Sequence, residues 1–121
     1  MEKQILLVDD EKDFTDLICT LLGFHNFGVE SVNDPVDMEA LITQKKFDLV
    51  VTDLMMPNLS GFDVVDQIRA KAEYKETPII VLSAKVLNDE ERKFLLQRKV
   101  HFVMKPFEPQ GLVEQIRQLL N

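Results

Sequence analysis

Five short apolar runs, each followed by a stretch with helical periodicity, constrain the fold of this chain most. The runs are the expected strands, at residues 4–8, 29–32, 47–52, 79–82 and 100–104. Most of them are apolar at every position rather than at every second one, which is typical of strands buried on both faces of a sheet. Strands that alternate with helices form parallel sheets through right-handed crossovers. The sequence therefore predicts an α/β fold, a doubly wound parallel sheet of five strands with helices on both faces.

The stretches between the runs carry recognisable helix starts. These are predicted at Asp34-Pro35, Ser60, Asn88 and Pro109. Two of them have the spacing of a capping box, Ser60 with Asp63 and Asn88 with Glu91. Asp34-Pro35 combines a capping residue with Pro at the first helical position. The helix from Ser60 is expected to reach about residue 72.

Length and composition fit one domain with one core. Residues 1–121 are expected to form a single domain with no output domain, since 45% are hydrophobic and 29% are charged without any shift along the chain. A net charge of −7 and scattered Lys and Arg argue against direct nucleic-acid binding. No apolar run approaches the length that crosses a bilayer. The single cysteine, Cys19, excludes an internal disulfide and fits a reducing cytoplasm.

Polar side chains follow four of the five runs directly. They are Asp9 and Asp10 after the first run, Asp53 after the third, Ser83 after the fourth and Lys105 after the fifth. In such sheets the carboxyl ends of the strands lie along one edge, where ligands bind. We therefore expect three carboxylates, one hydroxyl and one ammonium to gather there. Helix caps and turns explain one or two of these residues, but not the whole set.

Three neighbouring carboxylates require a cation. Two carboxylates about 4 Å apart repel each other by roughly 4 kcal/mol at an effective dielectric constant near 20. Carboxylate oxygens, completed by waters and a substrate phosphate, are typical ligands of Mg²⁺. Lys105 adds a second positive charge that can bind a phosphate or a carboxylate. The site is therefore predicted to bring a phosphoryl group to an acidic nucleophile, which would form an acyl phosphate.

Four stretches together resemble the receiver (CheY-like) domain of two-component response regulators, over essentially the whole chain. They are Leu6-Leu7-Val8-Asp9-Asp10-Glu11, Asp53-Leu54-Met55-Met56-Pro57 followed by Gly61 and Asp63, Val81-Leu82-Ser83-Ala84, and Lys105-Pro106-Phe107. The resemblance implies a flavodoxin-like (βα)5 fold with the strand order 2-1-3-4-5 that is known for this family. It also implies a cytoplasmic signalling domain rather than an enzyme, one that assists its own phosphorylation and dephosphorylation. Its partners would be a sensor histidine kinase or phosphotransfer protein, and a downstream protein target or output domain.

The resemblance assigns roles at the strand ends. Asp53 would take a phosphoryl group from a phosphohistidine of the partner kinase. Ser83 would hydrogen-bond a phosphoryl oxygen, and Lys105 would pair with the group. Mg²⁺ would be bound directly by Asp10, Asp53 and the backbone carbonyl of Met55, and by Asp9 mainly through water.

The resemblance also implies a switch. Phe102 would change rotamer when Ser83 moves, and the output surface would comprise the fourth helix, the fifth strand and the fifth helix. The Lys105-Pro106 bond would be cis. Met55 and Lys85 would flank the phosphoryl group, and neither offers a base or an amide to orient water. A fairly long-lived acyl phosphate is therefore expected.

One departure and three alternatives accompany this interpretation. Arg98-Lys99 stands where the family commonly has Gly-Ala, which suggests a different geometry at the end of the fourth helix. A pseudo-receiver would bind partners without phosphorylation. A phosphohydrolase of the haloacid-dehalogenase type needs a second Asp where Met55 stands. A flavin-binding module needs a phosphate-binding loop where Asp9-Asp10-Glu11 would repel phosphate.

Overall fold

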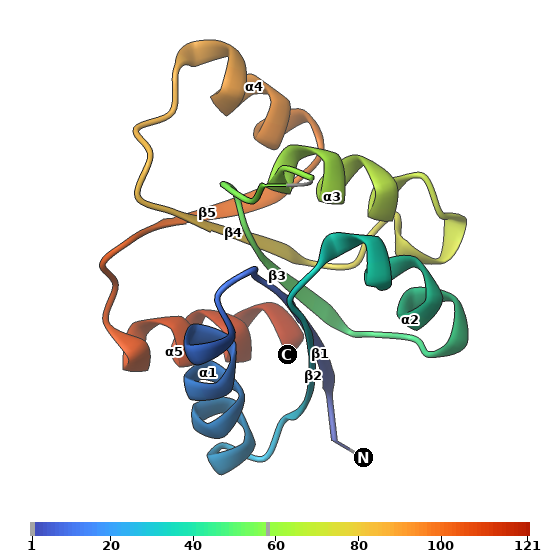
Figure 1. The fold of residues 1–121 in the computed structure, drawn as a ribbon, viewed down its shortest axis with the longest axis vertical. Coiled ribbons are helices and arrows are strands. Elements are labelled where there is room, and N and C mark those ends of the chain that lie inside the picture. The colour runs from blue at the N-terminus through green and yellow to red at the C-terminus, as the bar shows by residue number, and fades with distance from the viewer. Residues whose placement is uncertain (1, 58) are drawn as a thin grey trace.

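The computed structural model describes residues 2–57 and 59–121, and Figure 1 shows their fold. The strands are β1 (Gln4–Val8), β2 (Gly28–Val32), β3 (Leu49–Asp53), β4 (Ile79–Ser83) and β5 (Val100–Met104). The helices are α1 (Lys12–Phe24), α2 (Met38–Gln44), α3 (Gly61–Arg69), α4 (Asp89–Gln97) and α5 (Pro109–Leu120), with 3-10 turns η1 (Pro35–Asp37) and η2 (Ala72–Tyr74). All strand pairs are parallel and the order is β2-β1-β3-β4-β5. The predicted fold class and strand order are confirmed.

Two apolar layers flank the sheet because successive side chains of a strand point to opposite faces. Leu6 and Val8 of β1 pack in one layer with α2, α3 and α4, whereas Ile5 and Leu7 pack in the other with α1 and α5. Figure 1 shows α1 and α5 together on one side of the sheet. The central strands β3 and β4 are buried at every position, which explains their uninterrupted apolar runs. No helix in the described part of the chain is long and apolar enough to span a membrane.

Two elements start later than the sequence predicts. At Asp34-Pro35 the chain forms the turn η1, because a carboxylate oxygen of Asp34 accepts the N–H of Val36 at 3.0 Å, and α2 begins only after this turn. Strand β3 starts two residues after the predicted position. The reason is that the N–H of Phe47 donates to the Tyr74 hydroxyl at 3.1 Å instead of to a neighbouring strand. Both capping boxes, at the starts of α3 and α4, are confirmed.

Arg69 ends α3 three residues before the predicted end. Its guanidinium donates to the carbonyls of Tyr74 and Thr77, both at 2.7 Å, and to that of Arg98 at 2.9 Å. These bonds fix the chain that leads into β4 and the turn that leads into β5. In that turn Lys99 has φ 58°, so the left-handed residue that commonly follows a helix is present without a glycine.

Candidate functional site

The carboxyl ends of β1 and β3 bring three predicted site residues together. Asp9, Asp10 and Asp53 each offer a carboxylate oxygen, and these oxygens lie within 4.8 Å of one another. Asp9 is completely buried, Asp53 is 7% exposed and Asp10 is exposed. The cluster is thus a partly open acidic site at the edge of the sheet.

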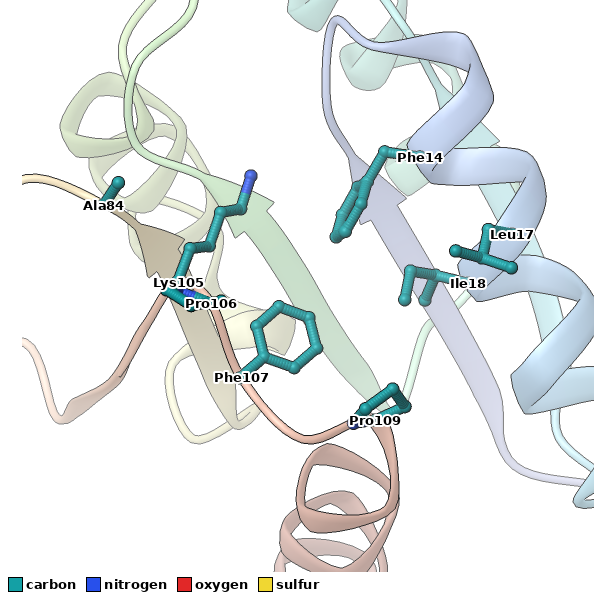
Figure 2. A pocket seen from close by; sticks show the side chains of 8 residues that line it. All are labelled: Phe14, Leu17, Ile18, Ala84, Lys105, Pro106, Phe107 and Pro109. Atoms are coloured by element: carbon teal, nitrogen blue, oxygen red, sulfur yellow. The ribbon is translucent and has the colours of Figure 1, made fainter.

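Lys105 supplies the cation of this site. Its ammonium lies 3.4 Å from Oδ1 of Asp53 and 3.7 Å from Oδ2 of Asp9. The Lys105 N–H donates to the carbonyl of Ser83 at 2.9 Å, which ties β5 to β4 just where both strands end. Figure 2 shows Lys105 and Phe14 facing each other, with the ammonium 4.5 Å from the centre of the ring. The Lys105-Pro106 peptide bond is cis, as the resemblance implied.

Burial is the main influence on the pKa of the two buried carboxyl groups, those of Asp9 and Asp53. It raises the pKa of Asp9 to about 6, with a further rise from the charge of Asp53, against the opposing hydrogen bond from the N–H of Glu11 at 2.9 Å. Burial also raises the pKa of Asp53, and Lys105 opposes that rise. Among the described residues, Oδ2 of Asp9 is the one buried side-chain oxygen or nitrogen without a hydrogen-bond partner. An oxygen in this state, next to two more carboxylates, fits a hard cation with its bound water as the missing partner.

Asn33 supports the acidic site, a role that its position after the edge strand did not lead us to expect. Its amide donates to the backbone carbonyl of Asp9 at 2.8 Å and to the Thr15 hydroxyl at 3.0 Å. Strand β2 pairs Val32 with Val8, so the next residues, Asn33 and Asp9, lie side by side. The strand order β2-β1-β3 was the signal that could have revealed this contact.

Gly61 allows α3 to begin directly against the end of β3. Its N–H donates to the carbonyl of Leu54 at 2.8 Å. A Cβ added here would lie 2.5 Å from the carbonyl oxygen of Asp53 and 2.8 Å from the Cα of Leu54. Contact this close requires glycine, and it fixes the backbone that carries Asp53. The Ser60 hydroxyl caps the same helix by accepting the N–H of Asp63 at 3.3 Å.

The remaining predicted residues lie around this centre. Ser83 is 1% exposed and ends β4, next to the end of β3. Phe102 faces the α4 layer, half-buried, two residues before the strand partner of Ser83. Met55 has an exposed side chain, and the role of its carbonyl stays a prediction. The ammonium of Lys85 pairs with Glu91 on α4, so in this structure it does not contact the acidic cluster.

An apolar groove of about 440 Å³ lies beside Lys105, between α1 and the segment that connects β5 to α5. It is lined by Phe14, Leu17, Ile18, Ala84, Lys105, Pro106, Phe107 and Pro109. Figure 2 shows Phe14, Leu17 and Ile18 on α1, facing Phe107 and Pro109 across the groove. The acidic site therefore has a hydrophobic surface directly next to it.

The fold and this site define a known class of signalling domain. Residues 5–117 match the model of the response regulator receiver domain family, and the chain belongs to that family. The regulatory protein VanRc of Enterococcus gallinarum is 32% identical over 121 residues, which are 100% of this chain and 51% of that protein. The transcriptional regulatory protein ResD of Bacillus subtilis is 33% identical over 120 residues, 99% of this chain and 49% of that protein. The chain thus spans about half the length of these two relatives.

Solved structures agree with this membership. The chemotaxis protein CheY4 of Vibrio cholerae superposes with a TM-score of 0.91 at 26% identity, covering 99% of this chain and 100% of that chain. A receiver domain protein (CheY-like) from Methanospirillum hungatei gives a TM-score of 0.90 at 25% identity, covering 99% and 94%. The similarity therefore extends over the complete sheet and its helices.

Proposed function

We propose that Asp53 accepts a phosphoryl group from a phosphohistidine of a sensor histidine kinase or phosphotransfer protein, in a reaction that depends on Mg²⁺. The observation that carries this proposal is the cluster of three carboxylates with Lys105 at the strand ends. Asp9 has no exposed surface, whereas Asp53 is 7% exposed and lies closer to Lys105, at 3.4 Å. In the transfer the N–P bond of the donor breaks as an O–P bond to Asp53 forms, and the departing imidazole keeps the electron pair.

Mg²⁺ fits the donor set, because hard cations take carboxylate and carbonyl oxygens. We expect Asp10, Asp53 and the Met55 carbonyl to bind it directly and Asp9 mainly through water. When bound, it supplies charge stabilisation to the phosphoryl oxygens. Lys105 holds a second positive charge at the same place, and the backbone bond from Lys105 to Ser83 keeps it there.

The apolar groove beside Lys105 is a suitable surface for the donor protein. A phosphohistidine reaches Asp53 only if its protein docks next to the site, and Leu17 at the rim of the groove is 66% exposed. Burial of such a side chain on docking contributes about 1.5–3 kcal/mol. The groove thus supports a protein donor rather than a small metabolite as the physiological source of phosphate.

The surface that signals phosphorylation to a downstream partner would comprise α4, β5 and α5. A phosphoryl group adds a charge of roughly −1.5 to −2 at Asp53, which attracts the Ser83 hydroxyl and the segment behind it. Phe102 lines a hollow of about 270 Å³ between α4 and β5, which gives its ring room to change rotamer. Leu96 is 78% exposed at the same place and is a ready contact for a downstream protein or output domain.

The intact mass after incubation with Mg²⁺ and acetyl phosphate tests the proposal. We expect a gain of one phosphoryl group in the wild type and in Asp13→Asn, which removes a carboxylate outside the cluster. Asp53→Asn should show no gain, and a chelator should abolish the gain in the wild type. If the folded wild type binds Mg²⁺ but gains no mass, the domain is a phosphorylation-independent binding module instead.

A further inference from the structure

An ion pair joins the segment after β4 to the first turn of α4. The ammonium of Lys85 lies 2.7 and 2.9 Å from the two carboxylate oxygens of Glu91. Glu91 also belongs to the capping box, because it accepts the N–H of Asn88 at 2.9 Å while its own N–H donates to Asn88 at 2.8 Å. The hydrogen bond from Lys85 holds the pKa of Glu91 below its usual range. Lys85 is therefore attached to a well-defined helix start.

The other end of Lys85 is attached to the proposed phosphorylation site. Its backbone N–H donates to the Ser83 hydroxyl oxygen at 3.0 Å. Residues 84–88 have no regular secondary structure, and within them the side chain of Leu87 is buried whereas that of Val86 is exposed. Lys85 thus connects the Ser83 hydroxyl, which would bind the phosphoryl group, with α4, which belongs to the proposed output surface.

We propose that the Lys85–Glu91 pair is a latch that holds residues 84–88, and with them Ser83, in the unphosphorylated arrangement. This inference rests on the proposed phosphorylation of Asp53. When the Ser83 hydroxyl moves toward a phosphoryl group on β3, the backbone of residues 84–88 follows it, and this movement draws Lys85 away from Glu91. The pair then exists in only one of the two states.

An interaction present in one state stabilises that state alone, so removing either partner shifts the equilibrium toward the other state. The two side chains are 36% and 19% exposed, so the pair belongs with partly solvated ion pairs. Loss of such a pair changes an equilibrium constant by about two- to five-fold. Each single variant should therefore shift the equilibrium toward the phosphorylated arrangement by the same factor.

The test is the affinity for beryllofluoride, a phosphoryl mimic, in the presence of Mg²⁺, for the wild type, Lys85→Met, Glu91→Gln and the double variant. Both single variants should bind about two- to five-fold more tightly, and the double variant no more tightly than either single one. A purely electrostatic effect on the anion predicts opposite shifts, because Lys85→Met removes a positive charge and should weaken binding, whereas Glu91→Gln removes a negative charge and should strengthen it. Tighter binding in both variants is therefore specific to a latch.

Glu76→Gln is the matched control, since it removes the partner of Lys99 in an exposed ion pair with no connection to Ser83. Its affinity should equal that of the wild type. If the single variants have a lower melting temperature but an unchanged affinity for beryllofluoride, the pair only stabilises the start of α4. If their affinities for beryllofluoride shift in opposite directions, Lys85 acts as a ligand of the phosphoryl group. Either result overturns the latch while the proposed function stands. If the wild type neither binds beryllofluoride nor gains a phosphoryl group, the proposed function fails, and the latch fails with it.

Discussion

Replacing Asp9 by Asn should stabilise the metal-free protein at neutral pH. The Asp9 carboxyl is completely buried and its pKa is raised from 3.8 to about 6, chiefly by burial. Each pKa unit corresponds to about 1.4 kcal/mol, so ionised Asp9 costs the folded state about 3 kcal/mol above pH 6. The amide of Asp9→Asn has nearly the same shape and carries no charge. It can still accept the N–H of Glu11 at 2.9 Å.

The sign of the pH dependence follows from the raised pKa. Between about pH 4 and 6 the folded state binds the Asp9 proton more tightly than the unfolded state does, so stability falls as the pH rises. The difference in unfolding free energy between Asp9→Asn and the wild type should be near zero below pH 4. It should grow to about 3 kcal/mol by pH 6.5 and stay constant above that. Burial raises the pKa of Asp53 in both proteins, so this part of its contribution cancels in the difference, whereas the repulsion between Asp9 and Asp53 is present only in the wild type and adds to the gain.

The assay is urea unfolding at a series of pH values with a chelator present, followed by the same series with Mg²⁺. A ligand at a hundred times its Kd stabilises the folded state by about 2.7 kcal/mol. We expect Mg²⁺ to raise the stability of the wild type and to raise that of Asp9→Asn much less. If Asp9→Asn without metal is no more stable than the wild type at pH 7.5, the pKa of Asp9 is not raised in the folded protein, and the reasoning from its burial is refuted.

Three further substitutions have defined outcomes. Gly61→Ala should lower the unfolding free energy by about 1–3 kcal/mol and slow phosphorylation, because its Cβ would lie 2.5 Å from a carbonyl oxygen of β3. Gly23→Ala is the control in the same urea and mass assays, since a Cβ added at Gly23 has nothing within 4 Å. Met55→Asn should speed hydrolysis of the acyl phosphate, since an amide can orient water, and an unchanged rate in a mass time course would contradict this explanation. Tyr74→Phe should cost about 1–3 kcal/mol in urea unfolding, because the buried N–H of Phe47 loses its acceptor, and an unaltered midpoint would show that water replaces it.

Strand and site positions could be predicted because they depend on short-range signals. Asp9, Asp53 and Ser83 directly follow apolar runs, and parallel pairing necessarily brings such residues to one edge. The capping boxes also depend on residues only three apart. These parts of the structure needed no knowledge of which strand pairs with which.

Contacts between distant segments could not be predicted in the same way. Asn33 reaches the carbonyl of Asp9 across 24 residues, and Arg69 reaches that of Arg98 across 29. Lys85 and Glu91 are only six residues apart, but their contact depends on the conformation of residues 84–88, which have no regular secondary structure. Each contact depends on strand order or on loop conformation, and the strand order itself came from the family resemblance rather than from periodicity.

Arg69 has a mechanical consequence for α4. Its guanidinium bonds to the carbonyl that follows the C-terminal end of this helix and to the segment that leads into β4. That end of α4 is therefore anchored, whereas its N-terminal end is attached through Lys85 and Glu91. When the Lys85–Glu91 pair opens, the N-terminal end of α4 is released while the C-terminal end stays anchored, so we expect the helix to tilt about its anchored end rather than to slide along the sheet. A small movement beside β3 would then become a larger displacement of the side chains on the first turn of α4.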